Sequence, residues 1–125
     1  MADQDAVRRI ALSLPEVEEG DSGFAFGVRR GAATKGIAWV WQERVEPKKP
    51  RVPNPEVLAV RVANEAEKQE LLSAAPDRFF TEPHYNGFPA VLVRLPAIDD
   101  EELRELLTDA WRALAPPKLV RESGL

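Results

Sequence analysis

Basic side chains concentrated in one segment are the feature of this sequence best suited to binding an anion. Residues 29–51 hold seven lysines and arginines but only two acids, a local charge of +5. Because the whole chain carries −4, the remaining residues sum to −9. Lysine and arginine side chains bind nucleic-acid phosphates in a salt-dependent manner. The candidate DNA-binding residues are therefore Arg29, Arg30, Lys35, Arg44, Lys48, Lys49 and Arg51.

This basic segment has two interpretations, and the sequence leaves both open. It could project from the fold as two wings that neutralise DNA phosphates, with no residue suited to reading bases. It could equally be a solvated surface without a partner, since charge runs often only keep a protein soluble. The anionic remainder would repel a polyanion over a broad contact, so any contact with DNA should have a narrow footprint.

A run of aromatic residues in the second half of the chain is another candidate site. Five side chains able to stack or pack fall within ten residues. They could line a pocket for a small ligand or a peptide, with the histidine as its polar anchor. They could also plug the end of a sheet as a satellite core. These residues are Phe79, Phe80, His84, Tyr85 and Phe88.

Two tryptophans, Trp39 and Trp41, stand in the middle of an apolar strand pattern. If they were exposed, they would offer flat surfaces on which unpaired bases can stack. Their alternation with Ile37 places all three on one face of the strand, and this pattern predicts that the tryptophans belong to the core.

The residue types needed for catalysis or for a metal site are scarce. The chain has no cysteine, and His84 is its single histidine, which excludes zinc sites built from these residues. It has no nucleophile elbow and no glycine-rich phosphate loop before a helix. The carboxylates at 16–21 and 99–102 lack a spacing that directs several oxygens to one point, and acids are common in a first helical turn.

We therefore expect a binding protein and not an enzyme, with no catalytic residue, cofactor or metal. The leading prediction is weak, salt-dependent DNA binding through a basic hairpin tip and the proline-rich loop. The alternative is a module that binds a protein or a small ligand through the aromatic loop 79–88.

Apolar periodicity indicates the elements that must hold these candidates. The strongest pattern is an apolar stripe that includes Leu103, Leu107 and Trp111, preceded by Asp99 as a helix cap. Elsewhere, period-2 alternation is typical of half-buried strands. The patterns predict helices over 3–14, 64–75 and 99–115, strands over 24–28, 37–41, 57–62 and 90–95, and short strands near 16–18 and 79–81.

The connection over residues 42–56 is unusual in its proline content. Four prolines fall between positions 47 and 55, so we expect an extended loop and neither a central strand nor a helix. The order of the elements lacks the regular strand-helix alternation of a parallel sheet. We therefore predict one domain over residues 1–125 of the α+β class. It should be a two-layer sandwich in which a curved antiparallel sheet carries the N- and C-terminal helices on one face.

Three stretches carry a resemblance to a known family. They are LPEVEE at 14–19, the DRFF-x-x-PHY-x-G run at 77–87, and the run DDEELRELLTDAWRALAP ending at Pro116. With these motifs, nearly the whole chain resembles the MmcQ/YjbR family of small bacterial proteins. The resemblance implies a frataxin-like (CyaY-like) fold in a double-wing arrangement, and it implies DNA binding by analogy of fold.

The sequence departs from the family pattern in two places. The stretch 46–55 is longer than the usual connection, and Phe88 and Pro89 follow the loop glycine where other residues are common. The N-terminus has acids and no long apolar run, so we predict no signal peptide, no membrane span and a cytoplasmic protein. The expected partners are DNA, contacted through its backbone, or an unidentified protein or small ligand.

Overall fold

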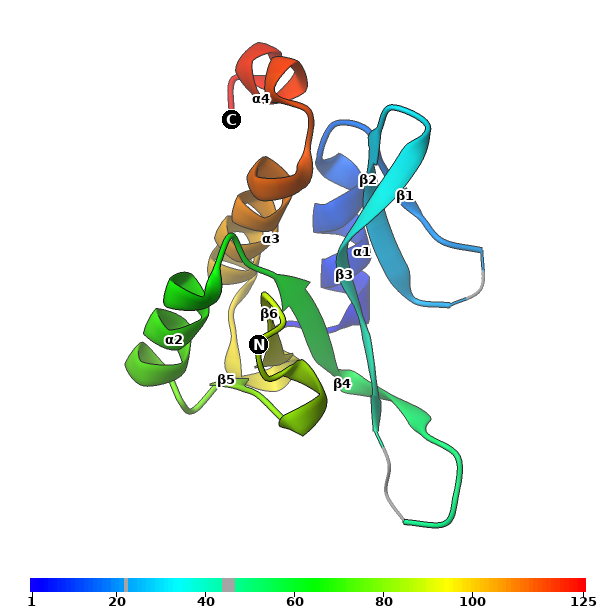
Figure 1. Ribbon diagram of the computed structural model, residues 1–125, viewed down its shortest axis with the longest axis vertical. Coiled ribbons are helices and arrows are strands. Elements are labelled where there is room, and N and C mark those ends of the chain that lie inside the picture. The colour runs from blue at the N-terminus through cyan, green and yellow to red at the C-terminus, as the bar shows by residue number, and fades with distance from the viewer. Residues whose placement is uncertain (22, 44–46) are drawn as a thin grey trace.

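The computed structural model describes residues 1–21, 23–43 and 47–125 of the chain. It contains one β-sheet, with helices along the chain as predicted for the α+β class (Figure 1). The strands are β1 (Val17–Glu19), β2 (Ala25–Arg30), β3 (Ala33–Glu43), β4 (Val52–Arg61), β5 (Phe79–Phe80) and β6 (Ala90–Arg94). The α-helices are α1 (Gln4–Ser13), α2 (Glu65–Ala74), α3 (Asp100–Leu114) and α4 (Pro117–Ser123), and short 3-10 turns are η1 (Pro83–Tyr85) and η2 (Leu95–Ala97).

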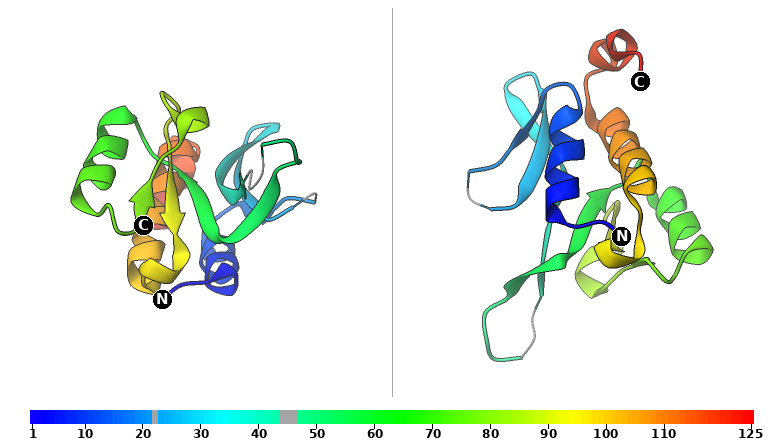
Figure 2. Two further views of the ribbon diagram at one scale, coloured as in Figure 1. Left: turned by 90° about the horizontal axis from the view of Figure 1, so that it is seen from below. Right: turned by 180° about the vertical axis from the view of Figure 1, so that it is seen from behind.

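The sheet has the strand order β1-β2-β3-β4-β6-β5. Every pair of neighbours is antiparallel. The helices α1 and α3 lie side by side and cover one face of the sheet, as the view from behind shows (Figure 2). This arrangement confirms the predicted antiparallel sheet with the terminal helices on one face.

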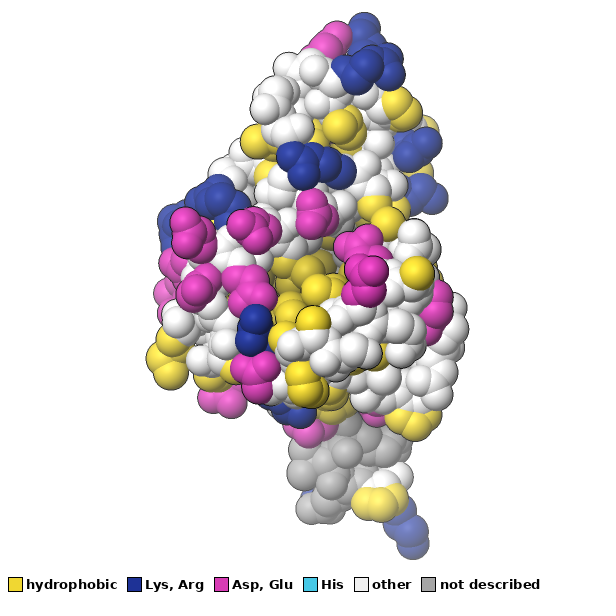
Figure 3. Space-filling model, turned by 90° about the vertical axis from the view of Figure 1, so that its left-hand side faces the viewer, with side chains coloured by type: hydrophobic (Ala, Val, Ile, Leu, Met, Phe, Trp, Pro, Cys, Tyr) yellow, Lys and Arg dark blue, Asp and Glu magenta, His cyan; other side chains and the backbone are white. Residues whose placement is uncertain are grey.

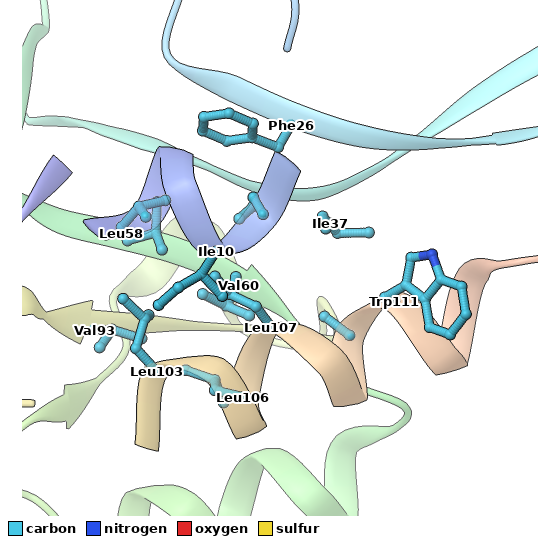
Figure 4. Packing of buried hydrophobic residues seen from close by; sticks show 14 of the residues in the cluster. Ile10, Phe26, Ile37, Leu58, Val60, Val93, Leu103, Leu106, Leu107 and Trp111 are labelled. Carbon is cyan, nitrogen blue, oxygen red and sulfur yellow. The ribbon is translucent and has the colours of Figure 1, made fainter. Parts of the chain in front are cut away.

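The main core lies between the sheet and these two helices. The apolar stripe of α3 packs against α1 and strand residues, with Ile10, Val60 and Leu107 close together (Figure 4). Trp111 is fully buried, and its indole Nε1 donates a hydrogen bond of 2.8 Å to the carbonyl oxygen of Pro15. The predicted caps are also present. Asp3 accepts from the amide of Ala6, and the helices α2 and α3 begin after Asn64 and Asp99 in the same way.

The proline-rich connection is only partly a loop. β3 continues to Glu43 and β4 begins at Val52, so the prediction of an extended loop over 42–56 is wrong at both ends. Pro53 and Pro55 are tolerated because β4 pairs with β6 only from Val57 onward. Before that residue β4 has a neighbour on one side only, and a proline costs no hydrogen bond on the open side. The β3–β4 ribbon therefore projects beyond the rest of the sheet (Figure 1).

The helix α4 has no counterpart in the sequence-based prediction. Pro116 and Pro117 end α3, as expected, but Pro117 also starts the next helix. The first turn of a helix leaves its N–H groups without intrahelical partners, so a proline there costs nothing. Gly124, with φ of 76°, ends this helix in the left-handed conformation. None of the helices that the structure describes combines the length and the apolar character needed to cross a membrane.

Candidate ligand-binding site on the aromatic face of the sheet

The face of the sheet opposite α1 and α3 carries its own apolar cluster. The register places Trp39 opposite Ala59, Ala59 opposite Leu92, and Leu92 opposite Phe80. These four residues thus form one row across β3, β4, β6 and β5. They belong to a hydrophobic cluster that is separate from the main core. We refer to this side of the sheet as the aromatic face.

A β-bulge decides which face the tryptophans occupy. The pairing of β2 with β3 shifts between Phe26 and Gly27, which leaves Ile37 as an extra residue in β3. Ile37 is buried in the main core, whereas Trp39 and Trp41 pack on the aromatic face. The prediction that the tryptophans share a face with Ile37 is therefore wrong, because the bulge interrupts the alternation of the strand.

The aromatic face contains a pocket of about 410 Å³. The ring of Phe88 lies in edge-to-face contact with Trp39 and Tyr85, at centroid distances of 6.3 and 6.1 Å. The indole Nε1 of Trp39 donates a hydrogen bond of 3.2 Å to the phenolic oxygen of Tyr85. These contacts join strand β3 to a loop far along the chain. The complete lining is Trp39, Val40, Trp41, Gln42, Arg51, His84, Tyr85 and Phe88.

The polar side chains of the pocket are Gln42, Arg51 and His84. Arg51 Nη1 donates a hydrogen bond of 2.9 Å to the carbonyl oxygen of Gln42, and lies 3.8 Å from a carboxylate oxygen of Glu82. A guanidinium has five N–H donors, so Arg51 keeps donors for a further acceptor. The side chain of His84 is exposed. Among the described residues that line the pocket there is no carboxylate, so its polar members favour an acceptor or an anion.

The indole Nε1 of Trp41 is buried and has no hydrogen-bond acceptor among the described residues. The Trp41 ring packs edge-on against Phe80, with the centroids 5.8 Å apart. Buried polar atoms are normally hydrogen-bonded. A buried donor without an acceptor is unusual among side chains that only fill a hydrophobic core.

A tight turn after β5 brings Tyr85 and Phe88 into the pocket. The amide of Tyr85 donates to the carbonyl of Glu82 at 2.8 Å, and the amide of Phe88 donates to the carbonyl of Tyr85 at 3.0 Å. Gly87 has φ of 78°, a left-handed conformation that glycine adopts without strain. The loop is therefore a defined turn, which places two rings on the same side of the sheet.

The structure divides the five aromatic-loop candidates between two places. His84, Tyr85 and Phe88 line the pocket, and Phe80 packs beside it on the aromatic face. Phe79 points to the opposite face, where it is 3% exposed within the main core. Successive residues of a strand alternate between faces, which explains why neighbours separate.

The basic candidates that the structure describes lie near the two ends of strand β3. Arg29, Arg30 and Lys35 surround the β2–β3 turn, whereas Lys48 and Lys49 lie beyond the other end of β3, in an exposed segment. The 11 residues of β3 separate these ends by roughly 33 Å. On the side drawn in Figure 3, acidic side chains gather over the middle of the molecule, and basic side chains occur among them as well as toward the top and bottom.

Several of these basic side chains already have partners within the chain. Arg29 lies 3.7 Å from a carboxylate oxygen of Glu18, and Arg30 donates a hydrogen bond of 3.1 Å to the carbonyl of Leu114. Arg51 lines the aromatic pocket. Arg44 lies outside the described residues.

Comparison with known proteins identifies the family. A sequence model of the family described as YjbR matches residues 12–113. The chain belongs to the YjbR family. It is 35% identical over 122 residues to the uncharacterized protein Rv2570 of Mycobacterium tuberculosis (strain ATCC 25618 / H37Rv), a match that covers 97% of this chain and 95% of that protein. The uncharacterized protein Mb2600 of Mycobacterium bovis is equally similar, with the same identity and coverage.

A solved structure shares the fold of this YjbR-family chain. The crystal structure of Deinococcus radiodurans protein DR2400, described as a DUF419 domain, superimposes with a TM-score of 0.69 at 22% sequence identity. The match covers 100% of this chain and 90% of that one. At this identity the likeness shows the arrangement of the sheet and helices.

Several acidic residues of this YjbR chain are engaged in caps and ion pairs. Arg8 Nε lies 2.9 Å from Glu19, and this hydrogen bond lowers the pKa of the Glu19 carboxyl. Arg78 Nε lies 2.8 Å from Glu102, and Arg9 pairs with the neighbouring acidic turn at the start of α3. In the part of the chain that the structure describes, no group of three or more histidine, aspartate or glutamate side chains could hold a metal ion.

Sequence reasoning did not assign Gln42, Trp39 or Trp41 to a ligand pocket. Arg51 was grouped with the basic wings, although it lines the pocket beside His84. The available signal was the presence of two tryptophans at i and i+2, which share a face where a strand is regular. The face itself depends on the bulge at Ile37, which no local pattern of residues indicates.

Proposed function

We propose that this YjbR-family protein is a non-enzymatic binding protein whose site is the aromatic pocket. Its ligand is a small molecule with a flat aromatic group and an anionic substituent. The observation that carries the proposal is the convergence of Trp39, Trp41, Tyr85 and Phe88 on one hollow, with Arg51 and His84 at its wall. Pockets for small ligands are mostly apolar, hold a few polar groups and measure about 300–1,000 Å³.

Two features favour a ligand site over a plug at the end of the sheet. Phe88 remains 39% exposed although its ring sits among aromatic neighbours. The Trp41 indole N–H is a buried donor without an acceptor among the described residues. A plug that served stability alone would bury Phe88 and satisfy the indole, because exposed apolar area and unpaired buried donors both cost free energy.

A matched pair of fluorescent probes tests the ligand class. The first is 1-anilinonaphthalene-8-sulfonate, and the second is N-phenyl-1-naphthylamine, the same ring system without the sulfonate. We expect the folded protein to bind one molecule of either probe, and the sulfonate probe more tightly. Phe88→Ala should weaken both. Arg51→Met should weaken only the sulfonate probe, by about tenfold, because it removes a charge-assisted hydrogen bond.

Leu12→Ser is the control, since Leu12 lies exposed on α1 and away from the pocket lining. It should leave the affinity of both probes unchanged. Wild-type protein that binds neither probe would refute the pocket as a site. Equal losses for both probes in Arg51→Met would refute the anionic part of the proposal.

A second candidate function is weak binding to the DNA backbone through basic residues at the two ends of strand β3. It is favoured by the exposure of Lys35 and Lys48 at opposite ends of β3. Carboxylates beside these residues, such as Glu18 near Arg29 and Glu82 near Arg51, repel a polyanion and keep any contact narrow. Two separate basic tips fit contacts to phosphates and not to base edges.

Salt dependence tests this second candidate. Neutralising Arg44, Lys48 and Lys49 with glutamine should make the affinity for a DNA duplex less steeply dependent on salt concentration, because fewer counterions are released on binding. Arg51→Met is the control, since its side chain faces the pocket. A salt slope that stays the same after the triple substitution would remove the ribbon tip as a DNA contact.

A further inference from the structure

The helix α2 buries one charged side chain completely. Lys68 is 1% exposed, and it is the single buried polar or charged residue among those that the structure describes. Its neighbours Gln69 and Glu70 are exposed. Lysine is rarely buried completely, because removing an ammonium group from water is costly unless strong hydrogen bonds replace the solvent.

The hydrogen bonds of Lys68 lead directly to the aromatic pocket. Its ammonium Nζ donates to the carbonyl oxygen of Tyr85, and to that of Phe88 at 3.1 Å. Both residues contribute rings to the pocket. The ammonium thus bridges the two ends of the tight turn that contains Gly87. No carboxylate within the described chain forms an ion pair with Lys68.

A second cation holds the same turn from the sheet. Arg61 Nε donates a hydrogen bond of 3.1 Å to the carbonyl of Pro89, and its guanidinium lies 5.2 Å from the centroid of the Phe88 ring. The ring of Phe88 is therefore placed by contacts with Trp39, Tyr85 and Arg61 on the pocket side. The hydrogen bond from Lys68 holds the backbone carbonyl of Phe88. The position of the ring depends on the turn, and residues 86–88 of the turn are exposed.

We propose that Lys68 is a positioning residue for the aromatic pocket: by fixing the carbonyls of Tyr85 and Phe88, it sets the orientation of two of the rings that receive the ligand. This inference deepens the proposed function and rests on it. Lys68 does not touch the ligand, because it is buried behind the turn. Its loss should loosen the turn and enlarge the set of pocket shapes, so binding weakens without a change in ligand preference.

The absence of cysteine from the chain allows a direct test. Lys68→Cys introduces a single thiol, which can be alkylated in the unfolded protein before refolding. Alkylation with 2-bromoethylamine gives a side chain of nearly the shape and charge of lysine. Alkylation with 1-bromopropane gives the same length without the ammonium group. The same two products at Gln69→Cys, which lies exposed on the next position of α2, form the control.

Hydrogen exchange and probe binding are then measured on each product. In the propyl form at position 68, we expect the amides of Asn86 and Phe88 to exchange about tenfold faster, because each opening no longer breaks the hydrogen bonds of the ammonium. The affinities for both naphthyl probes should fall by the same factor. The aminoethyl form should restore both properties, and the two forms at position 69 should not differ.

The outcomes separate this inference from the proposed function. If no form binds either probe, the proposed pocket fails, while exchange at Asn86 and Phe88 still decides whether Lys68 fixes the turn. Faster exchange spread evenly over the sheet, or a propyl form that does not refold, would show that Lys68 supports the whole fold and would overturn the inference. Identical exchange in the propyl and aminoethyl forms would overturn it as well.

Discussion

Trp39 and Tyr85 lie 46 positions apart in the chain, yet the indole Nε1 of the first donates a 3.2 Å hydrogen bond to the phenolic oxygen of the second. This contact joins the middle of strand β3 to the turn that closes the pocket. The proposed site requires these two segments to lie together. The pocket therefore exists because the interior strand β3 and the loop after β5 meet on the aromatic face.

Removal of the Tyr85 hydroxyl tests this link. Tyr85→Phe keeps the ring and deprives the Trp39 indole of its acceptor, so we expect the free energy of unfolding to fall by about 1 kcal/mol. Urea denaturation measures the change. Thr34→Val serves as the control, because the Thr34 hydroxyl makes an exposed hydrogen bond of 3.4 Å and should contribute little. Equal stability of Tyr85→Phe and wild type would contradict the contact.

The tryptophans of the two faces should respond differently to substitution by phenylalanine. Trp111→Phe removes a donor to the Pro15 carbonyl and leaves a cavity in the main core, so we expect a loss of about 2–4 kcal/mol. Trp41→Phe removes an N–H without an acceptor among the described residues and should cost clearly less. Denaturation of both variants gives the comparison. A larger loss of stability for Trp41→Phe than for Trp111→Phe would show that the aromatic face has the greater structural role.

Stability at acid pH should report the ion pair between α1 and β1. The hydrogen bond from Arg8 lowers the pKa of Glu19 from its ordinary value of 4.5. A carboxyl whose pKa is lower in the folded state stabilises the fold above its unfolded pKa, and this contribution is lost as pH falls through the folded pKa. Glu19→Gln should therefore be less stable than wild type at pH 7.

Wild type and Glu19→Gln should converge in stability as the pH falls through the lowered pKa of the folded Glu19, because the carboxyl is then protonated in both states. Denaturation curves at pH 7 and at a series of acid pH values measure the difference. Glu101→Gln is the matched control, because Glu101 is exposed in the first turn of α3. A difference between wild type and Glu19→Gln that persists at low pH would show that the charge of Glu19 is not its source.

Most of the fold could be predicted from local patterns of residues. The helix stripes, their caps and the main strands follow from periodicities of 3.6 and 2 and from Asp3, Asn64 and Asp99. The strand over 52–56 was missed because proline is incompatible with a central strand. The structure instead places Pro53 and Pro55 where β4 has one open side. The rule that excludes proline from central strands holds, but it could not indicate that the β3–β4 ribbon extends beyond the other strands.

The candidate site was only half visible in the sequence. His84, Tyr85 and Phe88 were identified as a cluster because they are close along the chain. Trp39 and Trp41 were assigned to the core because a bulge has no clear signature in a run such as GIAWVW. Arg51, just before β4, joins the pocket through contacts with Gln42 of β3 and Glu82 of the loop after β5. A site formed by segments distant in sequence requires the register of the sheet, which local periodicity does not contain.

The most direct test of the pocket uses the indole N–H signals of the three tryptophans in a proton-nitrogen correlation spectrum. Trp39 and Trp41 line the pocket, whereas Trp111 is buried in the main core and serves as an internal control. On titration with 1-anilinonaphthalene-8-sulfonate, we predict that the signals of Trp39 and Trp41 shift with one common dissociation constant while that of Trp111 stays in place. Unchanged signals from Trp39 and Trp41, or equal shifts of all three, would contradict a ligand site on the aromatic face.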